Sequence, residues 1–193
     1  LNCTSLIEIA IPSSVTSIGD RTFHHCISLR EITIPSSVTS IGNHAFNKCT
    51  SLEHIKISSS VINIGYCAFR ECKSLKYISI PSFITKIEGG SFCGCENLIC
   101  FLIPSSVTKI GGNSFNECKS LQKISIPSSV TSIGKLAFNQ CQSLKQITFE
   151  KPSVVKKIMK MTFSDCSSLT QISIPSSVIS IGNYAFYNCK ELE

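Results

Sequence analysis

The sequence repeats itself with a period of 23 residues, and this periodicity restricts the fold more than any other feature. Each unit follows the pattern L-x-x-I-x-I-P-S-S-V-x-x-I-G-x-x-A-F-x-x-C-x-S, which is first complete from Leu29 onward. A fixed period of this length is typical of a solenoid, in which each unit packs on its neighbours. We therefore expect about eight stacked units. The last Cys of the pattern recurs every 23 residues, with one interval of 25, at Cys3, Cys26, Cys49, Cys72, Cys95, Cys118, Cys141, Cys166 and Cys189.

The segment between the Leu and the Pro of each unit predicts one short β-strand. Its two Ile residues are separated by one polar position, as in Ile32 and Ile34, and this alternation favours a strand with one buried face. Pro lacks an N–H group and cannot continue a sheet ladder, so the strand ends there. The first Ser after Pro is expected to cap backbone groups of the turn. Strands of successive units should form a parallel sheet.

The remainder of each unit returns the chain to the next strand. The Gly of the pattern is replaced by Glu88 and Met159 in two units, so we expect no need for a positive φ there. The leg from Gly to Cys is too short for a long helix, and a turn of α- or 3₁₀-helix is expected. The extra two residues, Glu150 and Lys151, should bulge at the strand exit without breaking the stack. Phe fills one column throughout, at Phe23, Phe46, Phe69, Phe92, Phe115, Phe138, Phe163 and Phe186.

Cysteine is abundant, with 12 residues, and most of them occupy a single column of the repeat. Stacked units would place successive Cys side chains roughly 5 Å apart and parallel. A disulfide needs β-carbons that face each other at about 3.5–4.5 Å. The column therefore predicts buried, reduced thiols rather than disulfides. Reduced thiols suit an intracellular protein, but buried thiols also survive outside a cell, so both compartments stay open.

The repeat resembles the BspA-like, or Treponema pallidum-type, branch of the leucine-rich repeats, whose units carry I-P after the strand and then I-G-x-x-A-F-x-x-C. The resemblance covers essentially the whole chain. It implies an α/β solenoid: a right-handed leucine-rich repeat superhelix with one short parallel strand per unit and a short helical, 3₁₀ or extended return leg. The Ile-, Lys- and Ser-rich units are similar to those of parasitic protists. The resemblance implies a role in binding and supplies no catalytic residue.

The whole chain, residues 1–193, is expected to be one leucine-rich repeat array without internal domain boundaries. Because it begins and ends inside a unit, without the polar capping repeats that close a solenoid, we interpret it as a segment of a longer array. It contains no run of eighteen apolar residues, so no membrane span is expected. The sequence does not determine the oligomeric state.

No constellation of residues indicates catalysis. Cys93 and Cys95 are spaced like a metal-ligand pair, but Cys95 belongs to the buried column, and a zinc site needs two more ligands. We therefore predict no enzymatic activity, no cofactor and no metal. The net charge of +6 arises mainly from Lys, which a solvated face explains. An anion-binding strip is the alternative, but nucleic-acid motifs and interleaved aromatic residues are lacking, so no nucleic-acid partner is expected.

The variable strand positions that face away from the core are the candidate binding surface. Their side chains run from acidic in the first units, through apolar in the middle, to polar or basic in the last units. An apolar centre within a polar rim is typical of protein interfaces. We therefore predict a partner-binding site comprising Glu31, His54, Lys56, Tyr77, Cys100, Leu102 and Lys123.

Two functions agree with these observations. The first is a non-catalytic binding module of a cell-surface or secreted adhesion-type protein, which engages protein or glycan partners such as host matrix or cell-surface molecules. The second is a cytoplasmic leucine-rich repeat scaffold that holds other proteins together.

Overall fold

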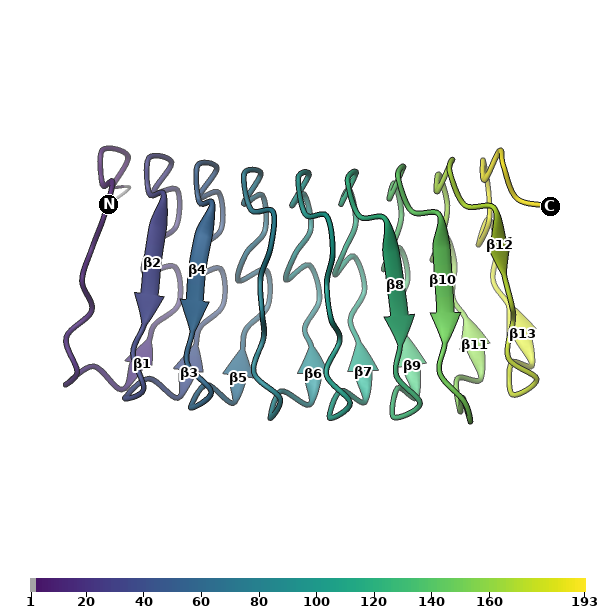
Figure 1. Ribbon diagram of the computed structural model, residues 1–193, viewed down its shortest axis with the longest axis horizontal. Helices are drawn as coiled ribbons and strands as arrows, with labels where there is room; N and C mark the ends of the chain where they lie inside the picture. Colours follow the sequence, from purple (N-terminus) through teal and green to yellow (C-terminus); the bar gives the residue numbers. More distant parts are fainter. Residues whose placement is uncertain (1–2) are drawn as a thin grey trace.

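The computed structural model describes residues 3–193, which form a parallel β-solenoid. In Figure 1 the chain descends along the near side, rises along the far side and advances toward the C-terminus, which makes a right-handed superhelix. Residues 3–193 contain no helix. The return leg instead consists of a two-residue strand followed by turns, so the expected helical or 3₁₀ turn does not form. We number the units 1 to 8 by their Phe, from Phe23 to Phe186.

The predicted strands lie side by side on one surface, here called the strand face (Figure 1). They pair in parallel with the repeat in register, so that Ile32 lies opposite Ile55 and Ile147 opposite Ile172. They form two sheets, of order β2-β4 and β12-β10-β8. The strands are β2 (Glu31–Ile34), β4 (His54–Ile57), β8 (Lys123–Ile126), β10 (Gln146–Phe149) and β12 (Gln171–Ile172).

The predicted strand is missing in units 1, 4 and 5. Residues 8–11 and 77–80 form no strand, and Cys100 makes only an isolated bridge to Lys123. Its absence from units 4 and 5 interrupts the strand face. The interruption coincides with a larger core residue, because Phe101 stands where other units have Ile. Its ring lies 4.8 Å from the rings of both Phe92 and Phe115, centroid to centroid. The sequence pattern did not predict this gap.

A second set of two-residue strands runs along the return leg, on the far side in Figure 1. The sequence analysis did not predict them. They form three parallel sheets, of order β1-β3-β5, β6-β7-β9 and β11-β13. The strands are β1 (Ser17–Ile18), β3 (Ser40–Ile41), β5 (Asn63–Ile64), β6 (Lys86–Ile87), β7 (Lys109–Ile110), β9 (Ser132–Ile133), β11 (Lys157–Ile158) and β13 (Ser180–Ile181).

Gly follows six of the eight return strands, and from Gly42 onward it allows a close approach to the preceding unit. None of these Gly residues has a positive φ, as expected. A Cβ at Gly111 would lie 2.5 Å from the backbone N of Gly89 in the preceding unit. Where the Gly is present, its N–H reaches the unit before, as from Gly111 to the Ile87 carbonyl at 2.7 Å. At Glu88 and Met159 this bond is absent, and the return sheets end between β5 and β6 and between β9 and β11.

The core contains a continuous stack of Phe rings. Successive rings are stacked with centroids 5.2–5.6 Å apart and interplanar angles of 2–17°. The Phe, Leu and Cys columns are buried together with the inner Ile residues in one cluster. Burial of a Phe side chain stabilises the fold by roughly 1.5–3 kcal/mol, so each ring contributes to holding its unit on the next.

A third ladder of backbone hydrogen bonds follows the Phe column along the array. Within each unit, the residues two before and two after Phe have left-handed backbone conformations, as at His44 (φ 54°) and Lys48 (φ 63°). Phe46 N–H donates to the Ala68 carbonyl at 2.8 Å, and His44 and Lys48 donate to the next unit in the same way. Left-handed non-Gly residues carry a steric cost, which this repeated bonding to the next unit offsets.

The turn after the strand is tied to its neighbour by the second Ser rather than the first. Ser60 Oγ donates to the Val38 carbonyl at 2.8 Å, and Ser106 Oγ to the Ile84 carbonyl at 2.6 Å. The capping role expected for the first Ser is seen at Ser153, which accepts from the Val155 N–H at 3.5 Å. The two-residue insertion follows β10, and β10 still pairs with both β8 and β12, as predicted.

The junction between units 3 and 4 is joined by fewer strand hydrogen bonds than its neighbours. Among the described residues, no strand bond links β4 to residues 77–80, and none links β5 to β6. The remaining backbone bonds there are mainly those of the Phe ladder, such as Phe69 N–H to the Ser91 carbonyl at 2.8 Å. Packing of the Phe stack thus holds this junction with little help from the sheets.

Candidate functional site

The seven predicted site residues all lie exposed on the strand face. Strand alternation places them there: in β2 and β8, inner Ile residues are buried while the residues between point outward. The exposed set is Glu31, His54, Lys56, Tyr77, Cys100, Leu102 and Lys123. They occupy units 2 to 6 of one continuous surface, so the structure gathers them along a strip rather than around a single point.

The middle of the strip carries two prominent apolar side chains. Tyr77 is 58% exposed and Leu102 is 82% exposed. Both belong to the units in which the strand face is interrupted, and Cys100 lies between them in sequence. An aromatic and an aliphatic side chain that remain this accessible on a polar face are suited to filling pockets of a protein partner.

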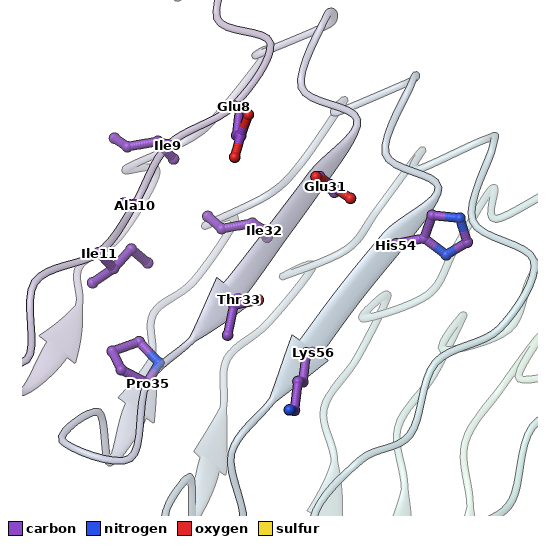
Figure 2. A pocket seen from close by; sticks show the side chains of 10 residues that line it. All are labelled: Glu8, Ile9, Ala10, Ile11, Glu31, Ile32, Thr33, Pro35, His54 and Lys56. Atoms are coloured by element: carbon purple, nitrogen blue, oxygen red, sulfur yellow. The ribbon is translucent and has the colours of Figure 1, made fainter.

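An open groove lies at the N-terminal end of the strand face. It measures about 370 Å³ and is lined by Glu8, Glu31, Thr33, His54 and Lys56 among others. Figure 2 shows these side chains projecting from neighbouring turns, with Glu31 and His54 at the upper end and Lys56 below. The groove therefore presents two carboxylates, an imidazole and a lysine ammonium group, all of which can form hydrogen bonds with a ligand.

A second open groove lies at the C-terminal end of the same face. It measures about 480 Å³, and Lys123, Lys145 and Lys151 line it together with Gln146 and Gln171. Along the strand face, carboxylates in the first units are thus followed by apolar side chains in the middle and by polar and basic side chains in the last units. Such a gradient favours a partner with the opposite order of charge.

All cysteines among residues 3–193 are free. Seven of the nine thiols in the Cys column are buried, as predicted, whereas Cys3 is exposed and Cys189 is half-buried. From Cys49 onward, each thiol of the column donates to the carbonyl of the Phe in the preceding unit, as from Cys72 Sγ to Phe46 O at 3.1 Å. Burial raises the pKa of the Cys49 thiol to about 12, and it raises that of Cys72 and Cys118 as well. These thiols are structural and unreactive at neutral pH.

The structure also shows one ion-pair network that the sequence analysis did not identify. Glu96 bridges two units, with Oε1 2.9 Å from Lys73 Nζ and Oε2 3.0 Å from Lys119 Nζ. Hydrogen bonds from the two lysines lower the pKa of the Glu96 carboxyl. All three residues occupy the same turn in successive units. Their alternating charges at a spacing of 23 residues could have predicted this network from the sequence.

Within the described residues, no group of three or more His, Cys, Asp or Glu side chains is arranged to hold a metal ion. The Cys93 and Cys95 pair does not acquire further ligands: Cys95 Sγ donates to the Phe69 carbonyl at 3.2 Å. Residues 3–193 also include no helix that could span a membrane.

Comparison with known proteins identifies relatives over the whole chain. A family model described as BspA type leucine-rich repeat region matches residues 1–122 and 91–193. No curated protein gives a significant match.

Three solved structures are similar. A leucine-rich repeat protein of Treponema pallidum is 28% identical with a TM-score of 0.69, over 97% of this chain and 78% of that one. One from Bacteroides ovatus is 30% identical with a TM-score of 0.71, over 99% of this chain and 60% of that one. A leucine-rich cell surface protein of Faecalibacterium prausnitzii is 28% identical with a TM-score of 0.65, over 97% and 67% respectively. All three are bacterial, so they lend no support to a protist source.

Proposed function

Because the chain belongs to the BspA-type leucine-rich repeat family, we propose that it is a non-catalytic binding module of a cell-surface or secreted adhesion-type protein. It engages protein or glycan partners through the strand face. The observation that carries the proposal is the exposure of Tyr77 and Leu102 between a groove of mixed charge and a groove lined by lysines. Solenoids bind partners along such extended surfaces because each unit contributes one row of side chains.

Surface localisation is supported by the family, whose members are commonly surface-associated. The similar structure from Faecalibacterium prausnitzii is described as a cell surface protein. The alternative, a cytoplasmic scaffold, is favoured by the free thiols, which a reducing compartment would preserve. The buried column is protected in either setting, because its thiols are inaccessible and their pKa values are raised by burial.

The test is a pull-down with the purified chain against immobilised host matrix proteins and, in parallel, against cytosolic extract. The double variant Tyr77→Ala, Leu102→Asp removes the apolar centre and is expected to abolish capture. The matched control is Ile62→Asp with Phe83→Ala, which changes two other exposed apolar side chains outside the strand strip. Capture that survives in the strand-face variant, or that is lost equally in the control, would contradict the strand-face site.

A further inference from the structure

A third hollow, open to solvent and here called the cavity, lies on the return leg of units 1 to 3, away from the residues of the strand-face strip. It measures about 430 Å³ and is lined by Asp20, Arg21, Asn43, His44 and Tyr66. Its size lies within the range of small-ligand pockets. The lining residues occupy the two variable positions after the return-strand Gly. Units 4 and 5 have mostly Gly at these positions, and the residues that line the cavity all come from units 1 to 3.

The polar groups of this cavity are already held in place by one another. The Asp20 carboxylate accepts from the Asn43 N–H at 2.6 Å and from Asn43 Nδ2 at 3.3 Å. The Asn43 side-chain oxygen in turn accepts from the Tyr66 N–H at 2.8 Å. Each unit therefore fixes the polar side chain of the one before it. A lining that is ordered before the ligand arrives reduces the entropy cost of binding.

Tyr66 supplies a fixed aromatic ring at the end of the cavity. Its ring centroid lies 5.8 Å from that of His44 in an edge contact. On its other side, a Cβ at Gly89 would come within 2.8 Å of Tyr66 Cε2, so the ring uses space that only Gly leaves open. The side chain is nevertheless half exposed. It offers a broad apolar surface with a polar tip to solvent.

His44 presents a ring nitrogen to the same cavity. Its Nδ1 lies 2.9 Å from Asn47 Nδ2. Nδ1 is thus engaged within the protein, and Nε2 is the ring nitrogen left for a ligand.

Arg21 lines the cavity without an ionic partner. Among the described residues, the Arg21 side chain makes no hydrogen bond or ion pair, whereas the Asp20 carboxylate accepts two hydrogen bonds from Asn43. Beside the cavity, burial together with the charges of His25, Arg21, His44 and Lys48 lowers the pKa of His24. A ligand with a negative group would therefore supply the ionic partner that Arg21 lacks.

We propose that this cavity binds a saccharide unit bearing a carboxylate or sulfate group. The Tyr66 ring packs against the C–H face of the sugar ring, Arg21 pairs with the anionic group, and His44 Nε2 forms a hydrogen bond with a hydroxyl. The planar guanidinium binds carboxylate or sulfate oxygens through two parallel hydrogen bonds. This site is independent of the strand face, so either one can fail without the other.

The test measures affinity, by calorimetry, for an oligosaccharide containing glucuronic acid and for a neutral glucose oligosaccharide of equal length. We expect binding of the acidic probe only. Arg21→Gln should weaken it by roughly tenfold or more, because a hydrogen bond to a charged group is lost. Gln adopts the same left-handed backbone at Gln140 (φ 58°), so the fold tolerates this change. Tyr66→Leu should weaken binding several-fold while it keeps the apolar volume.

Lys109→Gln is the matched control, because it removes the same charge from an exposed return-strand position in unit 5. Its affinity for the acidic probe should equal that of the unchanged protein. Equal losses in Arg21→Gln and Lys109→Gln would show general charge attraction and overturn the site. So would binding of the neutral probe alone, no binding of either probe, or full competition by an equimolar amount of inorganic sulfate, which would leave no role for the sugar ring.

Discussion

Cys118 Sγ donates to the Phe92 carbonyl across 3.2 Å, which joins the thiol column of one unit to the aromatic column of the unit before. The same bond recurs between other neighbouring units, as from Cys95 to Phe69 and from Cys141 to Phe115. Two buried columns that look independent in the sequence are thus one hydrogen-bonded structure. The stability of the array depends on both.

Removal of one ring from the Phe stack should be costly. Phe69→Ala is expected to lower the free energy of unfolding by about 3–5 kcal/mol, because its ring is fully buried between Phe46 and Phe92. Urea denaturation monitored by circular dichroism measures this loss. Phe83→Ala, at a 65% exposed position, should change stability by less than about 1 kcal/mol. Similar losses in both variants would contradict the importance of the stack.

The thiol column should resist modification in the native state. With a thiol reagent at pH 8, Cys3 and Cys100, which are exposed, should react rapidly, while the buried thiols react only after addition of denaturant. The reason is both access and chemistry, since burial raises the pKa of Cys72 and Cys118 and so removes the thiolate. Mass spectrometry of labelled peptides identifies the sites. Rapid native labelling of Cys72 would show that the column opens readily.

Alkaline pH should destabilise the array through these same thiols. The folded state raises their pKa above the ordinary 9.0, to about 12 at Cys49. The protonated form is thus preferred in the folded state, and its contribution is complete below pH 9 and lost as pH rises toward 12. Each buried thiol adds a slope of up to about 1.4 kcal/mol per pH unit. Urea denaturation at several pH values measures this slope.

The slope should become shallower in Cys118→Ala and stay unchanged in Cys100→Ala, whose side chain is exposed. Identical slopes in the two variants would mean that other groups cause the alkaline loss.

Gly positions should differ in how they tolerate a methyl group. Gly111→Ala is expected to destabilise the protein by about 1–3 kcal/mol, since the added carbon would lie 2.5 Å from Gly89 N. Gly19→Ala meets nothing nearer than 3.5 Å and should be neutral or slightly stabilising, because Ala restricts the unfolded chain. Thermal unfolding of the two variants compares them directly. A harmless Gly111→Ala would contradict the close approach of the units.

Amide hydrogen exchange should reveal the junction between units 3 and 4. The N–H groups of Tyr77, Ser79 and Glu88 form no backbone hydrogen bond among the described residues. Those of Tyr77 and Ser79 should exchange faster than their counterparts in β8, and that of Glu88 faster than that of Gly111, which donates to the Ile87 carbonyl. Exposed or unbonded amides exchange through small local openings rather than global unfolding. Mass spectrometry of the corresponding peptides measures the difference. Equal protection in residues 77–80 and in β8 would show that the junction is as closed as the others.

The periodic residues predicted most of the fold because each of them has one physical role in every unit. The alternating Ile residues specified the strands, Pro their end, and Phe and Cys the buried columns. The return strands were missed because two residues give no detectable alternation, and the gap at units 4 and 5 because it depends on how the Phe101 ring packs. The return-leg cavity was missed for another reason: Asp20, Asn43 and Tyr66 occupy variable positions, and only stacking brings them together.

The sparse bonding at the junction between units 3 and 4 has a mechanical consequence for the whole array. The array should bend most easily where the fewest strand hydrogen bonds join two units. This junction separates the groove beside Glu31 and His54 from the groove beside Lys123 and Lys145. Flexing at this one joint would change the span between the two grooves while leaving each intact. A long ligand that contacts both grooves would therefore bind best at one curvature of the array, in addition to requiring complementary charges.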